Sequence, residues 1–141
     1  MLDSKDDVDE NMDKNDGRVV SNFINNALKN KDLQIYGDGT QTRSLIYIDD
    51  QIKGLVQLIH SDIFLANIGS EFEIDMKSFA EKILEMIPES TSQIVFTEKL
   101  LDDPKQRRGC YSEMYSLGWY PKVDLNIGLQ HTIDYYRKLL E

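Results

Sequence analysis

Apolar residues along this chain change repeatedly between helical and strand-like spacing, and this alternation constrains the fold more than any other feature. Stripes that repeat every three to four residues predict helices, whereas short runs of β-branched and aromatic residues predict strands. Helices are expected over 18–29, 50–60, 76–87 and 125–140, and strands over 33–36, 44–48, 64–68 and 93–97. Helices that alternate with short strands are typical of an α/β domain.

Turn and cap residues mark the ends of these elements. The Gly-Asp-Gly run at 37–39 lies between the first two strands and predicts a hairpin turn. Asp75 and Asp124 each precede a helical stripe, and Asp49 or Asp50 precedes another. Their carboxylates can accept the free N–H groups of a first helical turn, so we expect them to be helix caps.

The first sixteen residues have a different composition. They hold seven acidic residues and two lysines, with few apolar side chains. Such a stretch cannot bury enough apolar surface to offset the entropy of ordering. We therefore expect a disordered acidic tail over 1–16 and one α/β domain over 17–141.

Charge and composition exclude several classes of protein. A formal net charge of -9 argues against nucleic-acid binding. No apolar run approaches the roughly 18 residues that span a bilayer, so we expect no membrane partner. Cys110 is the only cysteine, which favours a reducing compartment and a cytoplasmic location, and we expect it to be a semi-buried small residue. His60 and His131 are far apart in the sequence, so no metal site is expected.

Several strings of residues occur in the order of one enzyme family: 17–24 (GRVVSNFI), 36–44 (YGDGTQTRS), 47–50 (YIDD), 67–69 (NIG), 102–108 (DDPKQRR) and 117–121 (LGWYP). On these strings the chain resembles the UDP-glucuronate decarboxylases, or UDP-xylose synthases, of the extended short-chain dehydrogenase/reductase superfamily. The resemblance covers nearly all of 17–141. The strings at 37–39, 67–69 and 118–119 are shared with dehydratases and epimerases of other nucleotide sugars, so a fragment of such an enzyme is an alternative.

The resemblance implies a fold and a parent reaction. The fold is the α/β C-terminal substrate-binding part of an extended short-chain dehydrogenase/reductase, lacking most of the Rossmann domain, so that 17–141 is a partial nucleotide-sugar-binding domain. The reaction converts UDP-glucuronate to UDP-xylose and CO2. Bound NAD oxidises the sugar at C4, the ketone permits loss of the carboxylate, and the hydride returns.

The motifs for that chemistry are missing from the chain. No glycine-rich turn lies between a strand and a helix, and at 37–39 the third glycine of the pattern is replaced by Thr42. None of the tyrosines is followed four residues later by a lysine, the pair that the superfamily uses as its base. We therefore expect no catalytic or cofactor-binding residues here, no NAD bound by this chain alone, and no turnover.

Two arginines are candidates for binding a diphosphate. Arg43 follows the glycine-containing turn and precedes a strand, where its rigid guanidinium can make two parallel bonds to phosphate. The resemblance assigns the family's substrate-phosphate arginine to Arg43. By analogy Arg107, in the cationic cluster with Lys105 and Arg108, supplies the second contact. The alternatives are a surface side chain for Arg43 and a solvated loop for the cluster.

The other candidate substrate-binding residues are Arg18, Asn22, Leu33, Tyr36 and Asn67. Arg18 and Asn22 lie one turn apart near a helix start, where an anion is favoured. Leu33 and Tyr36 resemble the strand that borders the base, and Asn67 resembles an asparagine near the phosphate. Solvation of Arg18, core packing of Leu33 and Tyr36 and a turn role for Asn67 are alternatives, while Trp119 and Pro121 are expected to serve packing.

Three functional hypotheses follow. The first is a truncated decarboxylase that is inactive alone. The second is a non-catalytic module that binds a UDP-sugar or complements a separate cofactor half. The third is a structural remnant without a ligand. The resemblance also implies that residues 49–68 pack on the cofactor half in the family, so that here they leave apolar surface uncovered. A cofactor-domain partner or self-association is therefore also expected.

Overall fold

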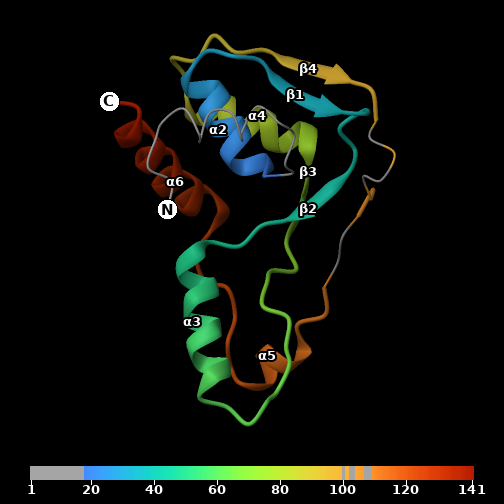
Figure 1. The fold of residues 1–141 in the computed structure, drawn as a ribbon, viewed down its shortest axis with the longest axis vertical. Helices are drawn as coiled ribbons and strands as arrows, with labels where there is room; N and C mark the ends of the chain where they lie inside the picture. Colours follow the sequence, from blue (N-terminus) through green and yellow to red (C-terminus); the bar gives the residue numbers. More distant parts are fainter. Residues whose placement is uncertain (1–17, 100, 102–103, 107–108) are drawn as a thin grey trace.

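The computed structural model describes residues 18–99, 101, 104–106 and 109–141 (Figure 1). The expected tail over 1–16 lies outside these residues. In chain order the elements are α2 (Val19–Leu28), β1 (Leu33–Tyr36), β2 (Thr42–Ser44), α3 (Ile48–Ile59), β3 (Glu73–Asp75), α4 (Met76–Met86), β4 (Ile94–Thr97), α5 (Ser112–Ser116) and α6 (Leu125–Leu139).

The first group of elements is built on a two-stranded parallel sheet. Strand β1 pairs with β4, with Leu33 opposite Ile94 and Tyr36 opposite Thr97. Parallel strands need a long crossover, and the chain between these two includes α4. Helices α2 and α4 lie beside the sheet, and α6 packs on α2 (Figure 1).

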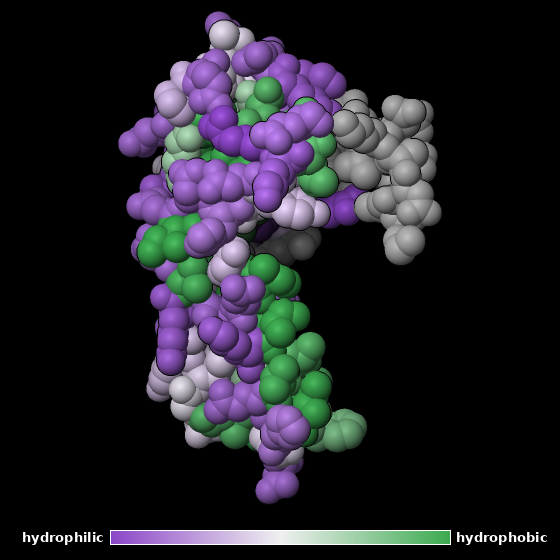
Figure 2. Space-filling model, turned by 90° about the vertical axis from the view of Figure 1, so that its left-hand side faces the viewer, coloured by the Kyte–Doolittle hydropathy of each residue, from purple (hydrophilic) through white to green (hydrophobic). Residues whose placement is uncertain are grey.

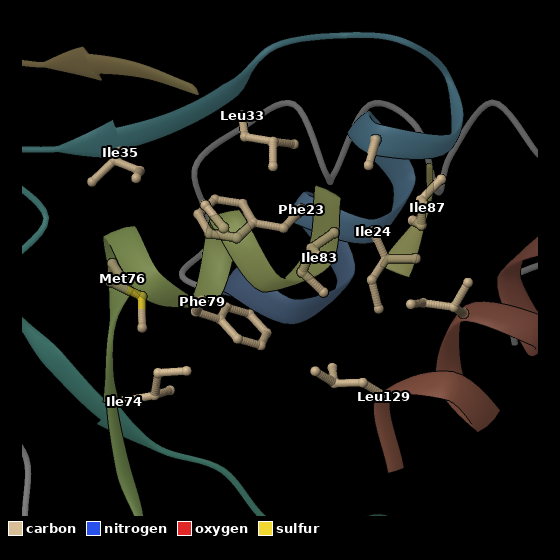
Figure 3. Close-up of a cluster of buried hydrophobic side chains, with 13 residues drawn as sticks. Phe23, Ile24, Leu33, Ile35, Ile74, Met76, Phe79, Ile83, Ile87 and Leu129 are labelled. Carbon is tan, nitrogen blue, oxygen red and sulfur yellow. The ribbon is translucent and has the colours of Figure 1, made fainter. Parts of the chain in front are cut away.

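The main hydrophobic core lies between these helices and β1 (Figure 3). The rings of Phe23 and Phe79 stack with their centroids 5.9 Å apart. Ile24, Leu33 and Ile133 are completely buried around them. Burying a side chain of this size is worth about 1.5–3 kcal/mol, so this cluster is the main source of stability.

A second group of elements packs around Trp119, at the other end of the molecule (Figure 1). We call it the Trp119 region: α3, α5 and the connections 61–70 and 117–123. The indole is buried, and its Nε1 donates to the backbone oxygen of Asp50 at 3.1 Å. Gly54 of α3 faces the ring so closely that a Cβ there would lie 2.9 Å from Trp119 Cε2. The expected packing role of Trp119 is confirmed.

Extended segments join the two groups (Figure 1). Strand β2 pairs antiparallel with β3, with Arg43 opposite Ile74. Thr42 also forms an isolated parallel bridge with Gln106. Three segments distant in sequence therefore run side by side at the position of Arg43.

Several expected elements are confirmed. Helices α2, α4 and α6 and strands β1 and β4 occupy the expected segments. Asp75 accepts the N–H of Ser78 at 2.8 Å, and Asp124 accepts that of Asn126 at 3.0 Å, so both are helix caps. None of the helices in the described residues has the length and apolar composition that crossing a bilayer requires.

Four expectations about the middle of the chain are wrong. The turn at 37–39 closes no hairpin, because β1 and β2 pair with other strands. The strand expected over 44–48 is β2, which ends at Ser44. Helix α3 begins at Ile48 with Tyr47 at its N-cap, so neither Asp49 nor Asp50 caps it.

The fourth concerns segment 64–68, which is not a buried strand. Phe64 is 100% exposed and Leu65 81% exposed. The apolar run suggested burial, but in the described structure no neighbouring strand offers this segment backbone partners.

Candidate functional site

Arg43 lies in the middle of β2 and is half-buried. Its Nη1 donates to the backbone oxygens of Thr42 at 2.7 Å and Pro104 at 2.9 Å. These bonds hold the guanidinium against segment 104–106. Arg43 is thus anchored by the chain that leads directly to Arg107.

The segment around Arg107 is fixed on both sides, although Arg107 itself lies outside the described residues. Before it, Gln106 bridges to Thr42 and donates from Nε2 to both carboxylate oxygens of Glu73, at 3.0 and 2.9 Å. After it, the backbone oxygen of Cys110 accepts a bond from Asn67 Nδ2 at 3.2 Å. Glu73 and Gln106 were missed by the sequence reasoning, which had no signal that β3 would reach this loop.

Asn67 lies in the connection 61–70 and is exposed. Two positions further on, the backbone of Gly69 lies so close to Tyr111 that only glycine fits, because a Cβ there would lie 2.7 Å from the Tyr111 hydroxyl. Segment 67–69 therefore packs directly on the chain that follows Arg107. Arg43 and Asn67, which are 24 positions apart in the printed sequence, meet the same loop from two sides.

Asn22 presents an unpaired polar atom. It lies in the first turn of α2, with its N–H bonded to the oxygen of Arg18 at 3.1 Å. Its Oδ1 is buried, and none of the described residues donates a hydrogen bond to it. An unpaired buried acceptor costs about 1–3 kcal/mol, so this oxygen favours a donor from outside the described chain. Arg18 itself is exposed at the N-cap of α2.

The two residues from β1 have different surroundings. Leu33 is completely buried in the main core, so the core-packing alternative is the one observed for its side chain. Tyr36, at the end of β1, is half-buried and its backbone oxygen accepts a bond from Gln41 Nε2 at 2.7 Å. Of this pair, only Tyr36 has side-chain surface open to a ligand.

The turn after β1 is filled by the chain itself. Gly37 and Gly39 have φ angles of 78° and 80°, which side-chain-bearing residues rarely adopt. Hydrogen bonds from Thr40 lower the pKa of Asp38 below 3.8, and the bond from the hydroxyl has a larger effect than the bond from the backbone N–H. A Cβ at Gly39 would lie 3.0 Å from Lys77 Cβ, and Lys77 N donates to the Gly39 oxygen at 3.2 Å. The turn rests on α4 and does not form an open phosphate cradle.

Cys110 differs from expectation because it is exposed and not semi-buried. A hydrogen bond with the Ser112 side chain, at 3.4 Å, lowers the pKa of its thiol below 9.0. The described residues contain no group of three or more His, Cys, Asp or Glu side chains that could hold a metal ion.

The sequence is similar to those of known proteins. The NAD dependent epimerase/dehydratase family matches residues 8–69, a range that begins within the expected tail. UDP-glucuronic acid decarboxylase 1 of Xenopus tropicalis is 42% identical over 92% of this chain and 31% of its own length. UDP-glucuronic acid decarboxylase 3 of Arabidopsis thaliana is 43% identical over 84% of this chain and 35% of its own length. The chain thus spans about a third of the length of these relatives.

Solved structures show the same fold. UDP-glucose 4-epimerase of Thermotoga maritima, solved with UDP-glucose, superposes with a TM-score of 0.82 at 27% identity, over 87% of this chain and 40% of that one. UDP-glucuronic acid 4-epimerase of Bacillus cereus, in complex with UDP-glucuronic acid and NAD, gives a TM-score of 0.77 at 29% identity, over 86% and 40%. The chain therefore has the fold of the extended short-chain dehydrogenase/reductase epimerases and dehydratases, and its sequence is similar to about a third of the length of the UDP-glucuronic acid decarboxylases.

Proposed function

We propose that this chain binds the diphosphate of a UDP-sugar through Arg43 and Arg107, as part of a site of the UDP-glucuronate decarboxylase type. The observation that carries the proposal is the anchoring of the loop around Arg107. Arg43 holds its beginning through Pro104, and Asn67 holds its end through Cys110. A guanidinium group can make charge-assisted bonds to a diphosphate, and the proposal assigns one such contact to each arginine.

The remaining candidates take roles that match their chemistry. Asn22 Oδ1 is an acceptor, so its partner is a hydroxyl donor such as those of a sugar, and not a phosphate oxygen. Arg18 at the start of α2 adds positive charge at a helix N-terminus. Tyr36 contributes its half-buried ring. Leu33 contributes only by positioning β1, because its side chain lies in the core.

The decarboxylation itself is assigned to a longer protein. NAD would supply the oxidation at the sugar carbon, but the residues of this chain do not fit that cofactor. The glycine turn at 37–39 is packed on Lys77, and no tyrosine-lysine pair is present in the sequence. We infer that the chain alone binds without turnover and that NAD-dependent chemistry needs a cofactor domain supplied elsewhere.

Titration calorimetry with UDP tests the binding role. Replacing Arg43 by Ala removes a charge-assisted contact worth about 1.5–3 kcal/mol, so the affinity for UDP is expected to fall roughly 10- to 100-fold. Arg137→Ala is the matched control, because Arg137 lies on α6 and pairs there with the carboxylate of Glu89, which follows α4. Equal binding of UDP by the wild type and by Arg43→Ala would show that the phosphate role is wrong.

The same samples separate the alternatives. Release of CO2 from UDP-glucuronate above a blank, or binding of NAD, would contradict the assignment of catalysis to a longer protein. Tighter binding of dTDP than of UDP would favour a fragment of a different nucleotide-sugar dehydratase or epimerase. Absence of binding to any nucleotide would contradict the proposed binding role, and would leave the structural remnant and the complement of a separate cofactor half as the remaining hypotheses.

A further inference from the structure

Hydrogen bonds hold together the extended segments that join the main core to the Trp119 region. Figure 2 shows hydrophobic residues gathered over the lower part of the molecule, on the side where Figure 1 places α3. At the level of Arg43 the contacts are polar instead. The N–H of Thr42 donates to the backbone oxygen of Lys105 at 2.8 Å, and Thr42 bridges to Gln106. Because Lys105 and Gln106 are exposed, the place of segment 104–106 depends on these bonds more than on burial.

The carboxylate of Glu73 links β3 to both of the other segments. Gln106 Nε2 donates to its two oxygens at 3.0 and 2.9 Å, and the hydroxyl of Thr42 donates to Oε1 at 3.5 Å. Glu73 is half-buried, and hydrogen bonds to an ionised acceptor are stronger than those between neutral groups. The side chain of Glu73 therefore fastens segment 104–106 to the sheet of β2 and β3.

The fastened segment is also the one that holds Arg43. The guanidinium donates from Nη1 to the backbone oxygen of Pro104 at 2.9 Å, and Pro104 lies two residues before Gln106. A shift of segment 104–106 would therefore move one of the two oxygens that orient Arg43. Binding groups need to be held within about 0.5 Å of their productive position, so such a shift weakens any contact that Arg43 makes with a ligand.

The charge of Glu73 and its hydrogen bonds act on an anionic ligand in opposite directions. An ionised carboxylate only accepts hydrogen bonds and repels a diphosphate, so the charge by itself weakens binding. The link to Gln106 strengthens binding, because it keeps Arg43 in place. Glu73→Gln removes the charge but keeps an amide that can bond to the amide of Gln106, whereas Glu73→Ala removes both. The two substitutions therefore separate the effect of the charge from that of the link.

We propose that Glu73 is a positioning residue for Arg43, which acts through Gln106 and segment 104–106 and does not itself contact the ligand. The inference rests on the diphosphate-binding role proposed for Arg43. It explains why an acidic side chain lies beside a site for an anion: the carboxylate orders the segment that orients the guanidinium.

Titration calorimetry of the full chain with UDP tests the proposal. We expect Glu73→Ala and Gln106→Ala each to weaken binding about 10-fold, and the double variant to be no weaker than either, because both remove one link. Glu73→Gln is expected to bind within about 3-fold of the wild type, or more tightly. Glu71→Ala is the matched control for charge, because Glu71 is exposed and makes no hydrogen bond to segment 104–106 among the described residues.

Hydrogen exchange without ligand tests the link independently of UDP. The N–H of Thr42 donates to Lys105, so its exchange is expected to become about 10-fold faster in Glu73→Ala. The N–H of Leu33, which is bonded within the main group, is the internal control and is expected to stay unchanged. Circular dichroism verifies folding, and Gln106→Ala, which changes an exposed side chain, takes the place of Glu73→Ala if the latter unfolds.

Several results would overturn the inference. They are UDP binding by Glu73→Ala that equals or exceeds that of the wild type, equal losses in Glu73→Ala and Glu73→Gln, and unchanged exchange of the Thr42 N–H in Glu73→Ala. If Arg43→Ala loses affinity for UDP and Glu73→Ala does not, this inference alone fails. If Arg43→Ala binds UDP as tightly as the wild type, the proposed function fails and this inference fails with it.

Discussion

Asp50 connects the first turn of α3 to the segment after Trp119, and its removal is the sharpest test of how the Trp119 region is held together. Asp50 is 3% exposed, and its Oδ2 accepts hydrogen bonds from the backbone N–H groups of Lys122 at 2.9 Å and Val123 at 2.8 Å. Replacement by Ala leaves both donors without this partner. Charge-assisted hydrogen bonds contribute about 1.5–3 kcal/mol each, and water can reach these half-buried donors in part. We expect Asp50→Ala to lower the free energy of unfolding by about 3 kcal/mol.

Asp49→Ala is the matched control for this prediction. Asp49 occupies the same helical turn but is exposed, so its loss removes only a helix-dipole interaction of about 0.3–1 kcal/mol. Asp50→Asn retains an acceptor oxygen without the charge and is expected to fall between the two.

Urea unfolding followed by tryptophan fluorescence is the assay. Trp119 is the only tryptophan, and its Nε1 bonds to the backbone of Asp50, so the signal reports the affected region directly. Circular dichroism of the same samples reports the helices of the main core. If Asp50→Ala lies within 1 kcal/mol of Asp49→Ala, the bonds to Lys122 and Val123 do not hold this region together.

Two further predictions concern helix ends and helix glycines. Hydrogen bonds from Ser78 lower the pKa of Asp75 below 3.8, and the bond from the backbone N–H has a larger effect than the bond from the hydroxyl. The ionised cap therefore stabilises the fold above about pH 4, and this contribution is lost as the pH falls further. Asp75→Ala should cost about 1 kcal/mol at pH 7 and less at pH 3, measured by urea unfolding; an equal cost at both pH values would exclude the ionised cap as the cause. In thermal unfolding, Gly54→Ala should destabilise the fold by about 1 kcal/mol, because overpacking against Trp119 outweighs the gain in helix propensity. Gly128→Ala should be neutral or stabilising, because its Cβ would lie 3.3 Å from Tyr47 and leaves more room. Equal effects of the two glycine substitutions would contradict the close packing on Trp119.

Local signals in the sequence were enough for much of the α/β pattern. The stripe of α2, the strands β1 and β4, and the caps Asp75 and Asp124 depend on residues within a few positions of one another. Short-range spacing and cap chemistry therefore predict them correctly. The family could also be inferred from the sequence, because its strings of residues remain in order.

Tertiary contacts decided what these local signals could not. The sequence favours a cap role for Asp50, but the N–H groups of Lys122 and Val123 draw its carboxylate inward. Likewise, the turn at 37–39 suggests a hairpin, but β1 finds its partner in β4, far along the chain. Such pairings depend on which surfaces meet after the helices pack, and that information is not present in any short stretch of sequence.

The candidate site divides in the same way. From the sequence by itself, Arg43 was identified by its place after a turn and by the resemblance to the family, and Asn67 by that resemblance alone. Only the tertiary structure brought them to the two ends of one loop, through the backbone oxygens of Pro104 and Cys110. Backbone oxygens are present at every residue and carry no sequence signal, so side-chain bonds to them become visible only once the chain is folded.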